Sequence, residues 1–242
     1  MNLITRRQWG AKTPAATYTR ISHTEGVKIH YTGGEVPSGI VKDHEICGEL
    51  VRQIQAMHMR GAREQPYNDI GYSLAVCPHR RVFMGRGPHA LPAANGAGLN
   101  TGHYAVLALV GSQGHTQPTT GMLAGIWDAI DYLRAEGDAG REIKGHRDGF
   151  STSCPGEPLY AWIRRGAPRP GTSEDDLPEL RPGDKNEHVV ELRKLLKAAN
   201  RTSDYFDPTD ADLVALLTAW KAARKLGGGL VWTSACWKAA GL

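Results

Sequence analysis

A near-continuous apolar run, YAVLALVGS at residues 104–112, restricts the fold more than any other segment of the chain. Such a composition is typical of a central strand that is buried on both faces. Two other segments have strand character: GVKIHYTGG at 26–34 is β-rich and ends in a glycine pair, and GYSLAVCPHRRVFMGRG at 71–87 reads as a hairpin that turns at 78–80. The sequence therefore predicts at least one sheet with a buried interior strand.

Two segments between these strands have helical periodicity. After Asp43, a suitable N-cap, apolar residues recur three and four positions apart at Ile46, Leu50, Ile54 and Met57. After Thr119 or Thr120 the same spacing recurs at Leu123, Ile126, Ile130 and Leu133, before Gly137 ends the run. Alternating strands and helices predict an α/β fold, with a mixed central β-sheet and helices packed on its faces.

A Pro-rich segment divides the chain. Residues 164–184, RRGAPRPGTSEDDLPELRPGD, contain four prolines and an acidic run and lack any helical or strand period. This composition predicts a semi-rigid linker. We expect a first domain at 1–165, a linker at 166–182 and a small helical domain at 183–242, where two apolar stripes have helical spacing.

Composition and charge exclude some classes of function. The N-terminus, MNLITRRQWGAK, turns polar within six residues, and no run approaches the roughly 18 to 20 apolar residues of a membrane span. We therefore expect no signal peptide and no membrane insertion. The formal net charge of +4 is small, and neither part of the chain has the concentrated basic face of a nucleic-acid binder.

The segment IKGHRDGFSTSCPG, residues 143–156, places His146 and Cys154 in one loop. Imidazole nitrogen and thiolate sulfur are ligands that Zn²⁺ prefers. If the strand ending at His30 neighbours the strand ending at His146, the two histidines lie side by side at the end of the sheet. Three protein ligands would leave one tetrahedral position open, as in catalytic zinc sites, and hydrolysis of an amide or ester is the leading reaction class. On spacing alone, the alternative remains open that these three residues are a core histidine, a surface histidine and a buried thiol that bind no metal.

Several segments of residues 1 to 165 resemble, in order, the zinc-dependent N-acetylmuramoyl-L-alanine amidases of the peptidoglycan recognition protein superfamily. The matching segments are ITRRQWGAK, IHYTGG, LVRQIQAMHMRG with YNDIGYSLAV, VFMGRGP, YAVLALVGS and GHRDGFSTSCPG. The resemblance implies a peptidoglycan recognition protein-like fold and a bound Zn²⁺. It implies hydrolysis of the bond between N-acetylmuramic acid and L-alanine in bacterial peptidoglycan.

Position by position, the resemblance implies His30, His146 and Cys154 as zinc ligands. Tyr72 would hydrogen-bond the water or the reacting carbonyl, and Thr152 would help to stabilise the oxyanion, although a loop hydroxyl that caps its own turn is an alternative. Asp148 either orients a ligand histidine or caps the following turn. Cys47, Cys77 and Cys236 are expected to pack as small apolar groups.

The C-terminal part resembles, more faintly, the small helical peptidoglycan-binding domains of wall hydrolases, through GDKNEHVVELRKLLKAAN, TAWKAARKLGG and WKAAGL. An amidase joined in this way to a wall-binding module, without a signal peptide, looks like a bacteriophage endolysin. We therefore expect a monomer that stays in the host cytoplasm until its release and then acts at the bacterial cell wall.

Three hypotheses follow. The first is the zinc amidase, and the second is a recognition module that binds wall fragments without cutting them. Cys154 argues against the second, because non-catalytic members of the superfamily typically lose that cysteine. The third, a nucleic-acid or polymerase-binding protein, is disfavoured by the near-balanced charge.

Overall fold

The structure is a computed structural model that describes residues 1–61, 65–170, 180–185 and 187–240. The chain divides into two compact units, Met1–Arg169 and Pro170–Leu242. None of the helices in the described ranges has the length and apolarity that crossing a bilayer requires.

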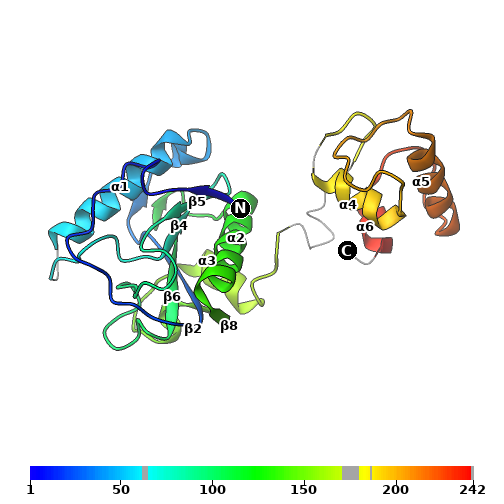
Figure 1. The fold of residues 1–242 in the computed structure, drawn as a ribbon. Coiled ribbons are helices and arrows are strands. Elements are labelled where there is room, and N and C mark those ends of the chain that lie inside the picture. Colours follow the sequence, from blue (N-terminus) through cyan, green and yellow to red (C-terminus); the bar gives the residue numbers. More distant parts are fainter. Residues whose placement is uncertain (62–64, 171–179, 186, 241–242) are drawn as a thin grey trace. The chain divides into compact units, whose positions relative to one another are not determined.

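The first unit is a mixed α/β structure (Figure 1). Its strands are β1 (Asn2–Ile4), β2 (Thr24–Tyr31), β3 (Glu35–Val36), β4 (Leu74–Val76), β5 (Arg81–Met84), β6 (His103–Ala108), β7 (Gln113–Gly114) and β8 (Ala139–Gly145). Its helices are α1 (Glu45–Arg60), α2 (Thr120–Gly137) and α3 (Glu157–Arg164), with 3₁₀ turns η1 (Ser38–Val41) and η2 (His146–Asp148).

The main sheet has the strand order β1-β5-β4-β6-β2-β8, and β3 pairs with β7 in a separate ribbon. The β4–β5 hairpin is antiparallel, and the other pairings of the main sheet are parallel. The predicted buried strand is confirmed, because β6 lies between β4 and β2 and all its residues are buried. The condition set for the two site histidines is also met: their strands are neighbours, and Ile29 of β2 lies opposite Gly145 of β8.

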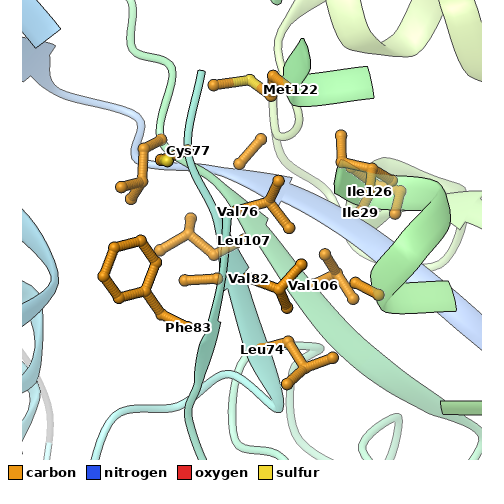
Figure 2. Packing of buried hydrophobic residues seen from close by; sticks show 14 of the residues in the cluster. Ile29, Leu74, Val76, Cys77, Val82, Phe83, Val106, Leu107, Met122 and Ile126 are labelled. Carbon is orange, nitrogen blue, oxygen red and sulfur yellow. The ribbon is translucent and has the colours of Figure 1, made fainter. Parts of the chain in front are cut away.

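Helices cover both faces of this sheet, with α1 on one side and α2 on the other (Figure 1). Apolar side chains from both layers pack in one core around β4 and β6, where Val76, Leu107 and Ile126 are fully buried (Figure 2). Burial of each such side chain contributes about 1.5–3 kcal/mol. The sheet is therefore a rigid platform for the loops at the ends of its strands.

The helix starts agree with the predicted caps in one case and differ in the other. Thr119 caps α2, because its hydroxyl accepts a hydrogen bond from the Met122 N–H at 3.0 Å. The N-cap of α1 is His44 and not Asp43. The carboxylate of Asp43 still accepts the N–H of Glu45 at 2.9 Å, so it satisfies one of the free donors of the first turn.

Part of the predicted linker 166–182 packs within the first unit. The indole N–H groups of Trp127 and Trp162 each donate to a backbone carbonyl, of Ala167 and Pro168 respectively, at 2.9 Å. Residues 171–179 of that linker lie outside the described residues.

The second unit contains, in its described residues, the helices α4 (Glu187–Leu196), α5 (Ala211–Ala223) and α6 (Ser234–Ala240). They enclose a core that includes Leu180, Val189, Leu192, Phe206, Leu213, Leu217 and Trp232. The buried Arg193 pairs with Asp210 at 2.7 Å, which also caps α5. The unit thus has an apolar core and a capped helix of its own.

Candidate metal centre

The two histidines predicted as ligands meet at the end of neighbouring strands. His30 lies one residue before the end of β2, and His146 directly follows β8. Because Ile29 and Gly145 are in register, the next residue of each strand brings its imidazole to the same edge, and the ring centroids are 4.5 Å apart. His30 is only 1% exposed.

The third predicted ligand arrives from the loop after η2. The Sγ of Cys154 lies 3.6 Å from Nδ1 of His30, and the donor atoms of Cys154 and the two histidines all lie within 4.8 Å of one another. A tetrahedral Zn²⁺, with Zn–S of about 2.3 Å and Zn–N of about 2.0 Å, separates such atoms by about 3.6 Å. The spacing of these three atoms therefore suits the ion.

Hydrogen bonds to Asn95 leave one nitrogen of each imidazole available. His30 donates from Nε2 to Oδ1 of Asn95 at 2.9 Å, so its Nδ1 carries the lone pair that faces Cys154. His146 hydrogen-bonds the backbone of Asn95. Within the described residues, its Nε2 is buried without a hydrogen-bond partner. A buried, orphaned nitrogen beside a thiol and an imidazole fits a metal ion, which would satisfy it.

These three candidate ligands lie in the wall of a cavity of about 320 Å³ that is also lined by Tyr72 and Thr152. The ring of Tyr72 meets that of His30 edge-on, with centroids 5.3 Å apart. Burial raises the pKa of Tyr72, so its phenol keeps its proton and can donate. The hydroxyl of Thr152 accepts the N–H of Cys154 at 3.2 Å, which leaves its own proton free for another acceptor.

Asp148 does not contact a ligand histidine through any described hydrogen bond. Its carboxylate accepts the N–H of Gly145 at 2.7 Å and the hydroxyl of Tyr160 at 2.6 Å. Of the two roles considered for Asp148, these contacts favour stabilisation of the η2 turn.

Two residues of the cavity region were not predicted as site residues from the sequence. Asn95 lies in a Gly-rich loop, far along the chain from both histidines, yet it is fully buried and hydrogen-bonds both. His58 lines the cavity, and its Nδ1 accepts the N–H of Gly71 at 2.9 Å. Its neutral ring is therefore the Nε2–H tautomer, which makes it a donor.

Replacement of Asn95 by leucine should lower the zinc affinity of the chain about 10- to 100-fold, the usual effect of losing a group that orients a ligand histidine. Asn95→Asp keeps an acceptor oxygen for His30 and should stay within a few-fold of the wild type. Competition with a chromophoric chelator measures both affinities. Wild-type affinity in Asn95→Leu would show that Asn95 does not orient the ligands.

The protonation states of the three ligands predict how metal binding depends on pH. Burial lowers the pKa of His30 to about 3, and burial also lowers the pKa of His146 from its ordinary value, so both imidazoles are mainly neutral at pH 7. Burial raises the pKa of Cys154 to about 11, so its thiol must lose a proton when a metal binds. Zinc affinity at this site should therefore rise about tenfold per pH unit between pH 7 and 8.

Calorimetric titration of the metal-free chain with Zn²⁺, in buffers of different ionisation enthalpy, counts the protons released. The difference between the wild type and Cys154→Ser should be about one proton per chain. A difference of zero would mean that Cys154 is not a ligand, or that its thiol is already ionised.

Comparisons with known proteins define the class of the fold. No model of a known protein family matches the chain. Peptidoglycan-recognition protein SD of Drosophila simulans is 28% identical over 166 residues, which cover 67% of this chain and 84% of that protein. The N-acetylmuramoyl-L-alanine amidase of Homo sapiens is 30% identical over 139 residues, or 56% of this chain and 23% of that protein.

Solved structures agree with these relatives. The crystal structure of Drosophila peptidoglycan recognition protein SD superimposes with a TM-score of 0.58 at 25% identity, covering 67% of this chain and 93% of that one. Wild-type Drosophila PGRP-LB does so with a TM-score of 0.56 at 24% identity, covering 67% and 92%. The chain thus has a peptidoglycan recognition protein-like α/β fold, and its homologues include proteins named as recognition proteins and proteins named as amidases.

Proposed function

We propose that the first unit is a zinc-dependent N-acetylmuramoyl-L-alanine amidase, which hydrolyses the bond between N-acetylmuramic acid and L-alanine in peptidoglycan. The observation that carries the proposal is the convergence of His30, His146 and Cys154 in the wall of a cavity. Three ligands that leave a coordination position open are typical of a catalytic zinc. Homologues named for this amidase activity support the choice of substrate.

In this proposal, each residue of the site has a separate task. His30, His146 and Cys154 hold the zinc, while Asn95 fixes the orientation of both imidazoles. When bound, Zn²⁺ supplies Lewis-acid chemistry that activates water and polarises a carbonyl.

Two hydroxyl groups of the cavity wall act on the substrate. Tyr72 and Thr152 donate hydrogen bonds to the carbonyl oxygen on which negative charge develops. Asp and Glu are absent from the described residues that line the cavity, so the wall supplies donors and imidazoles but no carboxylate base.

Digestion of purified peptidoglycan, with mass spectrometry of the products, tests the activity. Stem peptides with a free N-terminal L-alanine should appear beside intact glycan strands, and a chelator should abolish their release. New reducing ends would instead identify a glycosidase and contradict the proposal.

A recognition module is the second candidate, because several homologues are named as recognition proteins. A structurally similar protein, peptidoglycan recognition protein-LE, was crystallised with tracheal cytotoxin, described as a monomeric diaminopimelic acid-type peptidoglycan. Both candidates predict that the chain pellets with cell walls. Pelleting without cleavage, in a chain that carries zinc, would favour recognition over catalysis.

We further propose that the second unit binds the cell wall and that the whole chain acts as a bacteriophage endolysin. In this role it is a monomer that remains in the host cytoplasm until release and then acts at the wall, without binding nucleic acid. The proposal is supported by the resemblance of the C-terminal segments to wall-binding domains and by the near-balanced charge.

Truncation after Arg169 should keep the cleavage chemistry but reduce pelleting of the protein with cell walls. Unchanged pelleting would contradict the role of the second unit.

Replacement of Tyr72 by phenylalanine should lower kcat about 100-fold, because one donor to the developing oxyanion is lost. The zinc content should not change, since the phenol is not a ligand. Tyr132→Phe, on α2, is the matched control and should keep full activity. Steady-state kinetics on a soluble muropeptide measure the effect, and a kcat within threefold of the wild type would remove Tyr72 from the mechanism.

A further inference from the structure

A second group of metal-ligating side chains lies outside the cavity just described. His44 is the N-cap of α1, Cys47 lies in the first turn of that helix, and Cys77 directly follows β4. Their donor atoms all lie within 4.8 Å of one another. None of the three lines the cavity that holds His30 and Cys154, so this cluster has no role in the proposed amidase reaction.

The spacing within the cluster resembles that of a zinc site. Nδ1 of His44 lies 3.8 Å from Sγ of Cys77, close to the roughly 3.6 Å between nitrogen and sulfur ligands on one tetrahedral Zn²⁺. The corresponding distance between Cys154 and His30 is 3.6 Å. Small side-chain movements would bring the second cluster to the same geometry.

Cys77 lies in direct contact with the second cysteine of the cluster. Its sulfur accepts hydrogen bonds from the thiol of Cys47 and from the backbone N–H groups of His79 and Arg81. Both cysteines are fully buried. Figure 2 shows Cys77 at the end of its strand, at the margin of the apolar core. Cys47 and Cys77 thus make polar contacts with each other and with the backbone, whereas the sequence predicted only that they pack as small apolar groups.

His79 lies beside the cluster and would have to move towards it to complete the ligand set, because the group of donor atoms within 4.8 Å of one another does not include it. Its ring meets that of His44 edge-on, with centroids 5.3 Å apart. Its Nε2 donates to the carbonyl of Ile40 at 2.7 Å, so in the neutral ring Nδ1 carries the lone pair. Histidine ligands usually donate their second nitrogen to a carbonyl or carboxylate in this way. Along the chain, the set reads H-x₂-C at 44–47 and C-x-H at 77–79.

We propose that His44, Cys47 and Cys77, with His79 as fourth ligand, bind a structural Zn²⁺ that joins the start of α1 to the β4–β5 hairpin. Four protein ligands close the tetrahedron, as in structural zinc sites, and leave no position for substrate. The ion would connect two elements that lie about 30 residues apart in the sequence.

The first test is the zinc content of the full chain, purified under reducing conditions with zinc present and measured by elemental analysis. The wild type should contain two ions, and Cys154→Ser should keep one. A Cys47→Ser, Cys77→Ser double variant should also hold one and retain amide hydrolysis if the first unit is an amidase. The matched control is Cys236→Ser, a buried cysteine of the second unit, which should hold two.

A second test does not require the Cys47→Ser, Cys77→Ser double variant to fold. In the Cys154→Ser chain, Co²⁺ should give the intense tetrahedral d–d bands and thiolate charge-transfer band of a two-cysteine site, and His79→Gln should change the d–d bands. A Cys154→Ser chain without bound zinc or cobalt would overturn the proposal. A Cys47–Cys77 disulfide in the reduced preparation, seen as a mass loss of about 2 Da, would also overturn it.

Discussion

The replacement of Cys154 by serine is expected to lower amide hydrolysis at least about 1,000-fold. The thiolate would be one of three ligands, and a serine hydroxyl at pH 7 is a poor substitute for it. In the proposed mechanism, loss of the ion would remove a Lewis-acid contribution of several kcal/mol, and about 4 kcal/mol in the barrier corresponds to about 1,000-fold in rate. Thr152 and Tyr72 would remain in place, so residual activity would measure what the cavity does without the metal.

Mass spectrometry of wall digests and elemental analysis of the same preparations would measure this effect. Cys236→Ser should be fully active, because that thiol lies in the second unit. The far-ultraviolet circular dichroism of both variants should match that of the wild type. If Cys154→Ser kept more than a tenth of the activity, catalysis would not depend on a metal held by this cysteine.

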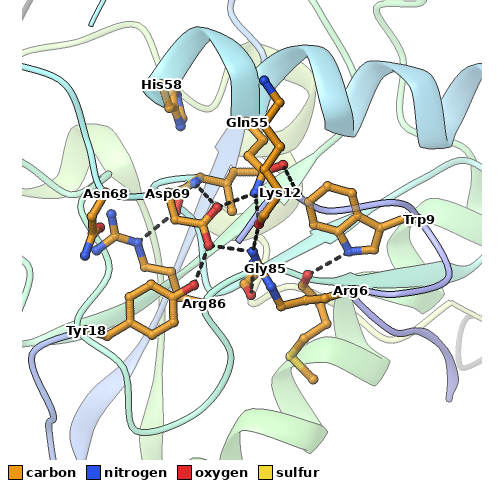
Figure 3. A network of polar contacts seen from close by, with 12 residues as sticks. Arg6, Trp9, Lys12, Tyr18, Gln55, His58, Asn68, Asp69, Gly85 and Arg86 are labelled. Atoms are coloured by element: carbon orange, nitrogen blue, oxygen red, sulfur yellow. Dashed lines mark hydrogen bonds and ion pairs between the residues drawn. The ribbon is translucent and has the colours of Figure 1, made fainter. Parts of the chain in front are cut away.

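The second large effect is expected at Asp69, the fully buried first residue of the DIGY segment at 69–72. Its carboxylate accepts hydrogen bonds from Gln55 Nε2 at 2.6 Å and from the hydroxyl of Tyr18, and it pairs with Arg6 at 2.8 Å (Figure 3). It also accepts the N–H of Ile70 at 2.7 Å. These contacts fix the backbone that leads to Tyr72.

Asp69→Ala should therefore lower the unfolding free energy of the first unit by about 3–5 kcal/mol, because the Arg6 charge and the Gln55 amide lose their partner. For a unit of this size, the loss corresponds to a decrease of roughly 6–20 °C in Tm. Asp131→Ala is the control. Its pair with Arg169 at 2.7 Å is about half exposed, and its loss should cost less than about 1 kcal/mol.

Calorimetry of the full chain can measure both variants, with the transition of the second unit as an internal reference. The first unit's transition should shift in Asp69→Ala while the other stays constant. If Asp69→Ala and Asp131→Ala were equally stable, the buried network would contribute no more than a surface ion pair.

Much of the fold could be predicted because the relevant signals are local. Three- and four-residue spacing predicted α1 and α2, and the uninterrupted apolar composition of 104–112 predicted the buried strand β6. The cap of α1 was predicted at Asp43, but η1 leads into the helix, so that His44 already has helical torsion angles. Caps depend on the path of the preceding chain, which a single residue type does not specify.

The residues of the site also differ in how far the sequence could predict them. The residue types and their order along the chain indicated His30, His146 and Cys154 as candidate zinc ligands, because imidazole and thiolate are recognisable zinc donors wherever they occur. Asn95 could not be found, since an asparagine in a Gly-rich loop is ordinarily a turn residue. Its role depends on the 65 residues of chain that separate it from His30 being folded so that the two side chains meet at 2.9 Å.

The sequence by itself determined the alternation of strands and helices, and the chemical types of the donors available to a metal. Only the tertiary structure decided which donors meet: His30 and Cys154, 124 residues apart, and His44 and Cys77, 33 residues apart. The physical reason is that hydrophobic periodicity and turn propensity act between near neighbours in the chain. Contacts between distant residues depend on strand register and on how helices pack against the sheet.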